Sequence, residues 1–253
     1  MKTENLISIK SKEELEILRE AGRILAAIIK ELQCFLKSGM VTRDIDLEAE
    51  KLMSKYKVKA AFKGYRGFPA SICLSINEEI VHGIPGGRIL KKGDVVSLDV
   101  GIIHRNFYSD TAMTVGVDEI SAELKKLLEV TEQSLTQGIA QAKVNSHLSD
   151  ISHAVQVFVE SKGFSVVRDF VGHGIGKQLH EDPEIPNFGP AGQGPLLKEG
   201  MVFAIEPMVN VGNWQTKILG DGWSVVTADG KPSAHFEHTI AITSNGPEVL
   251  TKE

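Results

Sequence analysis

The sequence is poor in cysteine and in long apolar runs, and each shortage excludes a class of protein. Two cysteines among 253 residues, Cys34 and Cys73, cannot build a disulfide framework and suit a reducing compartment. The longest apolar run in the N-terminal third, residues 24–29, is far shorter than the roughly 20 residues that a membrane span needs. Residues 1–10 have no signal-peptide layout. We therefore expect a cytoplasmic protein with no membrane partner.

The sequence also lacks an excess of basic residues. With 28 Lys and Arg against 33 Asp and Glu, the formal net charge is −5, whereas binding to nucleic-acid phosphates relies on clustered Lys and Arg. We expect no nucleic-acid partner. A hydrophobic content of 42% and a charged content of 24% are ordinary for a globular protein. A chain of this length can bury a sizeable core, so we expect one domain over residues 1–253 and a monomer.

The N-terminal part of the sequence has the periodicity of α-helices. Ser11 and Glu14 form an S-x-x-E capping box, and apolar residues follow at helical spacing as far as Leu32, which predicts an amphipathic helix. A second helix is predicted from about residue 42 to 56, with Thr42 as its N-cap. Strand-like sequence punctuated by Gly and Pro then covers about residues 60–117.

The same plan then repeats, with helices predicted at about residues 121–142 and 149–162 and strands after them. The stretch LKKGDVVSLD at residues 90–99 aligns with LKEGMVFAIE at residues 197–206, an offset of 107 positions. The sequence therefore predicts an α/β fold of the α+β kind, built from two helix–helix–strand halves. If an approximate two-fold relates the halves, Asp99 and Glu206 face each other.

Four acidic residues with apolar neighbours lie on strand-like sequence: Asp99, Asp110, Glu206 and Glu237. Taken singly, each fits a carboxylate at a strand end that reaches water or accepts a backbone N–H. Held close together, four ionised carboxylates repel one another and need positive charge among them. Because these strand segments contain no Lys or Arg, divalent metal is the simplest source of that charge.

Histidine extends this cluster. His173 lies between glycines in FVGHGIGKQLH, residues 170–180, whose spacing fits neither a GxGxxG phosphate loop nor an HExxH zinc helix. Four carboxylates with one imidazole suit two first-row ions such as Mn, Fe, Co or Zn. A two-metal site makes water a good nucleophile near neutral pH, which indicates hydrolysis. His82 in VHGIP and His180 in LHEDP are further candidates, although a histidine before such a turn commonly bonds only backbone.

The stretches VHGIP, SLDVG, YSDTA, GHGIG, FAIEPM and FEHT together resemble the methionine aminopeptidases, and the resemblance covers essentially the whole chain. It implies the pita-bread fold, in which two pseudo-two-fold-related halves share a central antiparallel sheet. The segment between His180 and Glu206 is too short for the long helical insertion of the type II enzymes. The resemblance therefore implies the short bacterial type I form.

The resemblance also implies residue roles. Glu206 would act as general base toward a water that bridges two metal ions, while His82 and His180 would contact the scissile bond and stabilise the tetrahedral intermediate. The implied ligands of the two divalent ions are Asp99, Asp110, His173, Glu206 and Glu237, with Asp110 and Glu237 touching both ions.

A methionine pocket of polarisable and aromatic side chains is implied as well. Its matching positions are Phe62, Tyr65, Phe68, Cys73 and Trp223, although plain core packing explains each of them equally well. Phe62 stands where a small Cys is common and Leu179 replaces a frequent Phe, which would reshape the pocket. Asn77 matches a turn where some relatives bind a monovalent cation. The implied substrate is the initiator methionine of nascent chains with a small second residue, and the ribosome is a candidate partner.

Two other hypotheses for the function remain open. An Xaa-Pro peptidase, such as aminopeptidase P or prolidase, shares the fold but usually carries an extra N-terminal domain, whereas the first helix here begins by about Ser11. A catalytically inactive pita-bread module that binds peptides typically lacks some metal ligands, whereas all five positions are filled here.

Overall fold

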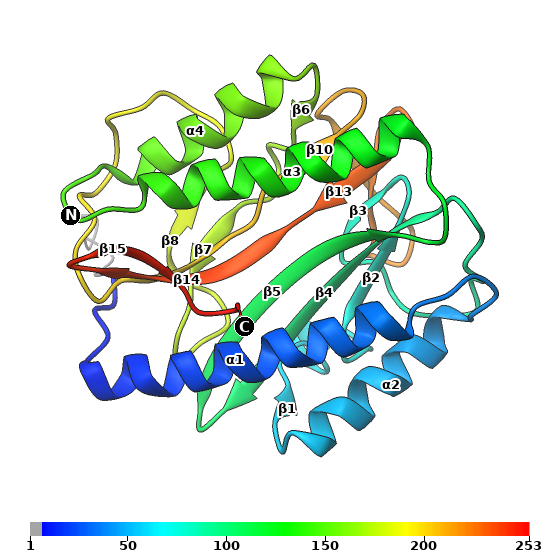
Figure 1. Cartoon of the computed structure of the whole chain (residues 1–253), viewed down its shortest axis with the longest axis horizontal. Helices are drawn as coiled ribbons and strands as arrows, with labels where there is room; N and C mark the ends of the chain where they lie inside the picture. Colours follow the sequence, from blue (N-terminus) through cyan, green and yellow to red (C-terminus); the bar gives the residue numbers. More distant parts are fainter. Residues whose placement is uncertain (1–6, 253) are drawn as a thin grey trace.

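A curled antiparallel sheet forms the centre of the molecule, and α1 and α3 cross one face of it with α2 and α4 outside them (Figure 1). The computed structural model describes residues 7–252. The helices are α1 (Lys12–Phe35), α2 (Thr42–Lys55), α3 (Ala122–Gln141) and α4 (Leu148–Ser161), with a 3-10 turn, η1, at Tyr65–Gly67.

The large sheet has the order β1-β4-β5-β14-β9-β7-β8, with β2 also paired to β4 and β15 to β14. Its strands are β1 (Lys59–Ala60), β2 (Cys73–Ile76), β4 (Val95–His104), β5 (Phe107–Gly116), β7 (Gly172–Gly174), β8 (Glu181–Ile185), β9 (Val202–Ile205), β14 (Glu237–Thr243) and β15 (Gly246–Val249). One small sheet, β13-β10-β6, contains β6 (Ser165–Val166), β10 (Met208–Asn210) and β13 (Ser233–His235). The other, β11-β12-β3, contains β3 (Glu79–Val81), β11 (Thr216–Ile218) and β12 (Val225–Thr227).

The helices begin close to where the sequence predicts. At α1 the capping box is confirmed, because the backbone N–H of Glu14 donates to Ser11 Oγ at 3.2 Å and that of Ser11 donates to Glu14 Oε2 at 2.9 Å. The N-cap prediction for α2 is wrong, since Val41 holds that position. The hydroxyl of Thr42 instead accepts the N–H of Gly86 at 2.8 Å, so a tertiary partner replaces the local cap.

The pseudo-two-fold organisation is confirmed by equivalent contacts in the two halves. An isolated bridge joins Val41 to Ile89 before α2, and another joins His147 to Leu196 before α4. The aligned stretches ending at residues 99 and 206 supply β4 and β9. The halves meet at the pairing of β5 with β14, in the middle of the sheet (Figure 1).

Threonine hydroxyls supplement the backbone pairing at this seam between β5 and β14, where the strands pair through only two residue pairs. Each hydroxyl is buried and donates to a carbonyl on the facing segment at 2.6–2.9 Å. The pairs are Thr239 with Asp110, Thr111 with Glu237, and Thr114 with His235. Since Asp110 and Glu237 are two of the predicted metal ligands, the seam fixes the backbone at these positions.

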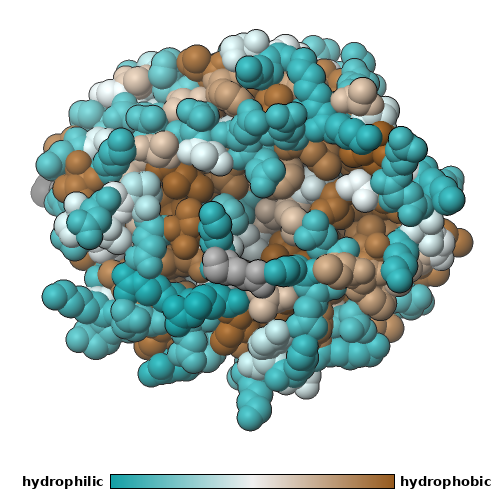
Figure 2. Space-filling model, viewed as in Figure 1, coloured by the Kyte–Doolittle hydropathy of each residue, from teal (hydrophilic) through white to brown (hydrophobic). Residues whose placement is uncertain are grey.

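Each half buries an apolar cluster beneath its helix pair, around Leu25 and Leu98 in the first half and around Leu135 and Phe203 in the second. On the helix side a groove of about 560 Å³ runs between α1 and α3, and Figure 2 shows apolar side chains in it. None of the helices within residues 7–252 is long and apolar enough to cross a membrane.

Thr239→Val keeps the side-chain volume but removes the hydroxyl that pairs with both backbone groups of Asp110. We expect the free energy of unfolding to fall by about 1–3 kcal/mol, because buried polar groups lose their partner. Urea denaturation measures the loss. Thr136→Val, on the exposed face of α3, should change stability by less than about 0.5 kcal/mol. Equal stability of the Thr239 variant and the parent would contradict the role given to the seam.

Candidate active site

One cavity of about 160 Å³ collects every residue that the sequence predicts for divalent-metal binding, catalysis or the methionine pocket. Its lining consists of Phe62, Tyr65, Arg66, Phe68, Cys73, Val81, His82, Asp99, Asp110, His173, Leu179, His180, Glu206, Trp223, His235 and Glu237. Residues on β2, β4, β5, β7 and β14 and on loops of both halves thus converge on one hollow.

Within the cavity, three residues from strands of the central sheet lie close together. Asp110 on β5, His173 on β7 and Glu237 at the start of β14 each offer a ligand atom, and these atoms lie within 4.8 Å of one another. Glu206 follows β9 directly, and its Oε1 lies 3.6 Å from His173 Nε2. These side chains can hold a cation between them.

The glycines on either side of His173 allow the backbone of β7 to lie close to the neighbouring segments. A Cβ at Gly172 would lie 2.5 Å from the carbonyl oxygen of Ala204, and one at Gly174 would lie 2.2 Å from that of Asp182. No side chain fits at either position without moving backbone. His173 Nδ1 lies 2.9 Å from the carbonyl of Gly174. When Nδ1–H donates to that carbonyl, the lone pair on Nε2 faces the carboxylates.

Asp99 and Glu206 line the same cavity, as the internal repeat predicts. Asp99 lies opposite Cys73 in the pairing of β4 with β2. Burial and the nearby charge of Asp99 raise the pKa of Glu206 well above its ordinary value. The backbone carbonyl of Glu206 accepts from Asn187 Nδ2 at 3.0 Å, which fixes the end of β9.

Three acidic residues of this cavity have raised pKa values and a carboxylate oxygen without a hydrogen-bond partner among residues 7–252. Burial, and then neighbouring carboxylates, raise the pKa of Asp110 and Glu237 well above the ordinary range. Burial raises the pKa of Asp99 to about 7. Within residues 7–252, Asp99 Oδ1, Asp110 Oδ1 and Glu237 Oε1 are buried without a hydrogen-bond partner. Burial also lowers the pKa of His173 to about 4, so the ring is neutral near pH 7. A neutral imidazole among unpartnered carboxylates fits divalent cations.

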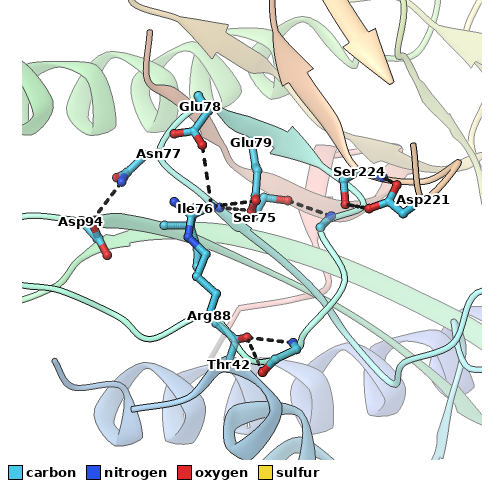
Figure 3. Close-up of polar contacts among 12 residues, drawn as sticks. Thr42, Ser75, Ile76, Asn77, Glu78, Glu79, Arg88, Asp94, Asp221 and Ser224 are labelled. Carbon is cyan, nitrogen blue, oxygen red and sulfur yellow. Dashed lines mark hydrogen bonds and ion pairs between the residues drawn. The ribbon is translucent and has the colours of Figure 1, made fainter. Parts of the chain in front are cut away.

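His82 lies on a loop that several polar contacts fasten (Figure 3). Its backbone adopts φ = 59°, an uncommon value for a residue other than glycine. Glu79 accepts the N–H of Ile76 at 2.8 Å and pairs with Arg88 Nη1 at 2.7 Å, and the Thr42 hydroxyl holds Gly86 (Figure 3). These contacts hold the loop, and His82 lines the cavity.

His180 lies at the mouth of the cavity. The hydroxyl of Tyr65 is 2.8 Å from its Nδ1, and the rings of His180 and His173 have centroids 4.3 Å apart. Burial, followed by His173 and Arg66, lowers the pKa of His180 to about 3. The ring is therefore neutral near pH 7 and offers one donor and one acceptor.

The predicted pocket residues form the apolar side of the cavity. Phe68 and Trp223 contact edge to face with centroids 5.1 Å apart, and Phe62, Cys73 and Leu179 are buried beside them. Trp223 is placed by the carboxylate of Asp221, which accepts its backbone N–H at 2.8 Å.

Asn77 lies outside this cavity, in the turn between β2 and β3. Its side chain donates to Asp94 at 2.9 Å and accepts the N–H of Val95 at 3.0 Å (Figure 3 shows the contact with Asp94). Its carbonyl accepts the N–H of Ser233 at 2.8 Å. A monovalent cation at this turn stays a prediction.

Sequence reasoning missed His235, Arg66 and Val81, which also line the cavity. His235 is 2% exposed, and its Nε2 lies 3.9 Å from Glu206 Oε2. Strand periodicity could have found it, because alternate residues share a face and His235 precedes Glu237 by two. Arg66 lies in η1 at φ = 49° and carries no comparable pattern.

A curled antiparallel sheet with this cluster in its hollow is the architecture of a metal-dependent peptidase. The model of metallopeptidase family M24 matches residues 16–244, so the chain belongs to that family. This assignment agrees with the resemblance that the sequence motifs indicate.

Its relatives narrow the assignment. The chain is 54% identical to methionine aminopeptidase 1 of Bacillus subtilis over 98% of its own length and 100% of that protein, and 52% identical to methionine aminopeptidase of Clostridium perfringens over 97% and 99%. The crystal structure of methionine aminopeptidase from Thermotoga maritima superposes with a TM-score of 0.96 at 45% identity, covering 98% of this chain and 100% of that one. Within M24 the chain therefore falls among the methionine aminopeptidases. Prolidase from Pyrococcus furiosus, 23% identical with a TM-score of 0.79, shares the fold.

The described chain also has the features of the type I form. Between His180 and Glu206 it contains β8, a loop and β9, with no helix in this stretch. The expected pita-bread fold and the short form are both confirmed.

Asp110→Asn should stabilise the metal-free protein near neutral pH. A carboxyl whose pKa is raised on folding contributes stability fully below its unfolded pKa, and that contribution is lost as the pH rises through the folded pKa. Asn cannot ionise, so the variant should match the parent near pH 4 and exceed it at pH 7.5 by roughly 1–3 kcal/mol. Denaturant unfolding of chelator-treated protein at both pH values measures this.

Asp118→Asn, in an exposed turn, is the matched control and should show no such pH-dependent gain. If Asp110→Asn were instead less stable than the parent at pH 7.5 without metal, the carboxylate would have a compensating partner and the electrostatic account would be wrong.

Proposed function

We propose that the chain is a methionine aminopeptidase that hydrolytically releases the initiator methionine of proteins and prefers a small second residue. The observation that carries this proposal is one cavity in which a cluster of carboxylates and a neutral imidazole adjoins an apolar pocket. The similarity to methionine aminopeptidases over nearly the whole chain supports it. We also assign the whole chain to one catalytic domain.

The ligands of two divalent ions in this proposal are Asp99, Asp110, His173, Glu206 and Glu237. Their mixed oxygen and nitrogen atoms suit Mn, Fe, Co or Zn. When bound, such cations would compensate the buried carboxylates and make water a good nucleophile near neutral pH. The unpartnered oxygens of Asp99, Asp110 and Glu237 support this assignment.

Glu206 acts as the general base. It lies between the other carboxylates and His235, and as an ionised carboxylate it can accept a proton from water and later deliver it to the leaving amine. Its place directly after β9, with its carbonyl held by Asn187, keeps the carboxylate aimed at the reacting atoms.

His180 and His82 serve the scissile bond. When the hydroxyl of Tyr65 donates to His180 Nδ1, the proton of the neutral ring resides on Nε2. That N–H can donate to the carbonyl oxygen as negative charge develops there. His82, on the first-half loop, contacts the scissile amide. Burial lowers the pKa of His82, so this ring also acts in its neutral form.

Methionine binds against Phe68, Trp223 and Cys73. Sulfur against aromatic edges is favourable by about 0.3–1.5 kcal/mol, which selects methionine over an aliphatic side chain of equal size. Phe62 and Leu179 complete the wall of this small cavity. A buried reaction centre also leaves little room for the second residue, which supports the preference for small ones.

We place the reaction in the cytoplasm, on nascent polypeptides and with the ribosome as a candidate partner. The exposed Cys34 and the buried Cys73 are both free thiols, which suits a reducing compartment.

The test is a mass-spectrometric assay of metal-stripped protein that has been re-titrated with Mn, Co, Fe or Zn. Met-Ala-Ser, Leu-Ala-Ser and Ala-Pro-Ala are supplied in parallel. We expect metal-dependent release of Met alone, because the pocket selects the thioether. Cleavage of the proline peptide would overturn the pocket assignment and leave the metal site standing, and inactivity on all three with every metal would reject the enzyme assignment.

Substitution of the two classes of histidine should separate their roles. His173→Ala removes a ligand, so metal affinity should fall at least about tenfold and activity should fall with it. His82→Ala should retain the metal and lower kcat by about 100- to 1,000-fold, as expected for a donor to the reacting groups. Metal content by plasma mass spectrometry and kcat are measured on the same samples. His153→Ala, exposed on α4, is the control. Full activity of metal-loaded His82→Ala would remove the role given to His82.

A further inference from the structure

A buried ion pair lies beneath the loop that carries His180. We propose that Lys10 is a positioning residue for catalysis, which holds His180 in place through its neighbour Glu181. This inference rests on the role of His180 in the proposed function.

The Lys10 side chain is only 3% exposed, although it carries a charge. Its Nζ lies 2.5 Å from Glu181 Oε2 and 2.6 Å from Ser8 Oγ. The Glu181 side chain is 14% exposed. The pair joins residues 171 positions apart in the sequence, so it ties the N-terminal segment to the second half. Glu181 follows His180 directly.

The second carboxylate oxygen of Glu181 closes the loop itself. Glu181 Oε1 accepts the backbone N–H of Lys177 at 2.7 Å and that of Gln178 at 3.1 Å. One carboxylate therefore binds the loop backbone with one oxygen and Lys10 with the other. His180 lies between these anchored positions.

The Lys10 side chain also fills the space beneath the loop. A Cβ at Gly176 would lie 2.4 Å from Lys10 Cε, so the Lys10 side chain packs directly on the backbone of Gly176. The carbonyl of Gly176 accepts the N–H of Tyr108 on β5 at 2.7 Å. The loop is thus supported by Lys10 from below and attached to the central sheet.

Lys10 is fixed at its own backbone too. Its N–H donates to the carbonyl of Gly200 at 2.8 Å, in the turn that precedes β9 and Glu206. Lys10 thereby couples the His180 loop to the strand that delivers Glu206. His180 itself lies at the cavity mouth, where Tyr65 is its hydrogen-bond partner. Its aim depends on how rigidly the loop is held.

The first half has a corresponding device. The pair of Arg88 with Glu79 fastens the loop that carries His82 (Figure 3). Each substrate-side histidine therefore lies close to an ion pair whose carboxylate also accepts a backbone N–H. The pair of Lys10 with Glu181 is more buried than the pair of Arg88 with Glu79. Loss of Lys10 or Glu181 therefore leaves the other charge buried without its partner.

The test is a double-mutant cycle on metal-loaded protein with Met-Ala-Ser. Lys10→Met and Glu181→Gln are each made alone and combined with His180→Ala. Gln at position 181 can still accept from the loop N–H groups, so it removes chiefly the charge. We expect each single variant to lower kcat about 10- to 100-fold with KM changed less than about threefold, as for a displaced catalytic group. In the His180→Ala background neither substitution should lower kcat further.

Lys177→Met is the matched control, since Lys177 lies on the same loop and its Nζ pairs with Glu14 at the surface. It should leave kcat unchanged. Equal losses of kcat with and without His180, or full kcat in folded Lys10→Met and Glu181→Gln, would overturn the proposal. If Lys10→Met fails to fold, Glu181→Gln decides the question.

The outcomes separate this proposal from the proposed function. An inactive parent enzyme would reject the function, and an unimpaired His180→Ala variant would reject His180 and Lys10 together. An impaired His180→Ala variant with no coupling to residue 10 or 181 would reject Lys10 alone.

Discussion

Mutual repulsion among buried carboxylates is the constraint on which the rest of the structure depends. Asp110 and Glu237 are almost fully buried, and neighbouring carboxylates raise the pKa of each further than burial alone. A flexible scaffold would relax by moving them apart. Strands β5 and β14 prevent this because threonine hydroxyls pin the backbone at both residues. The fold therefore maintains an unfavourable charge cluster that cations can relieve.

The two-fold arrangement explains how one chain assembles this cluster. Asp99 and Asp110 come from the β4–β5 hairpin of the first half, while in the second half His173 lies on β7 and Glu206 directly follows β9. Neither half contains the complete set, so the site exists only where the halves meet. Placing the site at the seam also makes the seam's stability a condition for catalysis, since a shift between β5 and β14 would separate the candidate ligands Asp110 and Glu237.

Local patterns predicted the helices, the two-half organisation and the acidic and histidine residues that the structure gathers in one cavity, because caps, periodicity and apolar neighbours lie close in sequence. The failures have a common physical cause in tertiary partners. Thr42 is a good cap residue, yet Gly86 takes its hydroxyl. The role proposed for Lys10 depends on its pairing with Glu181, which is 171 positions away in the sequence. No local sequence pattern indicates that a lysine is buried. Strand alternation places His235 on the same face as Glu237, but the sequence interpretation assigned a role to Glu237 alone.

The chemistry and the specificity occupy different parts of the fold. The candidate ligands sit on or next to central strands, while Phe62, Phe68 and Trp223 lie on loops and turns around them. Phe62 packs against Gly101 on β4, where a Cβ would lie 2.5 Å from its ring. Phe62 thus uses space that a glycine provides. Because these three pocket residues lie on loops and turns, a change among them can alter the shape of the pocket without moving the charge cluster on the strands.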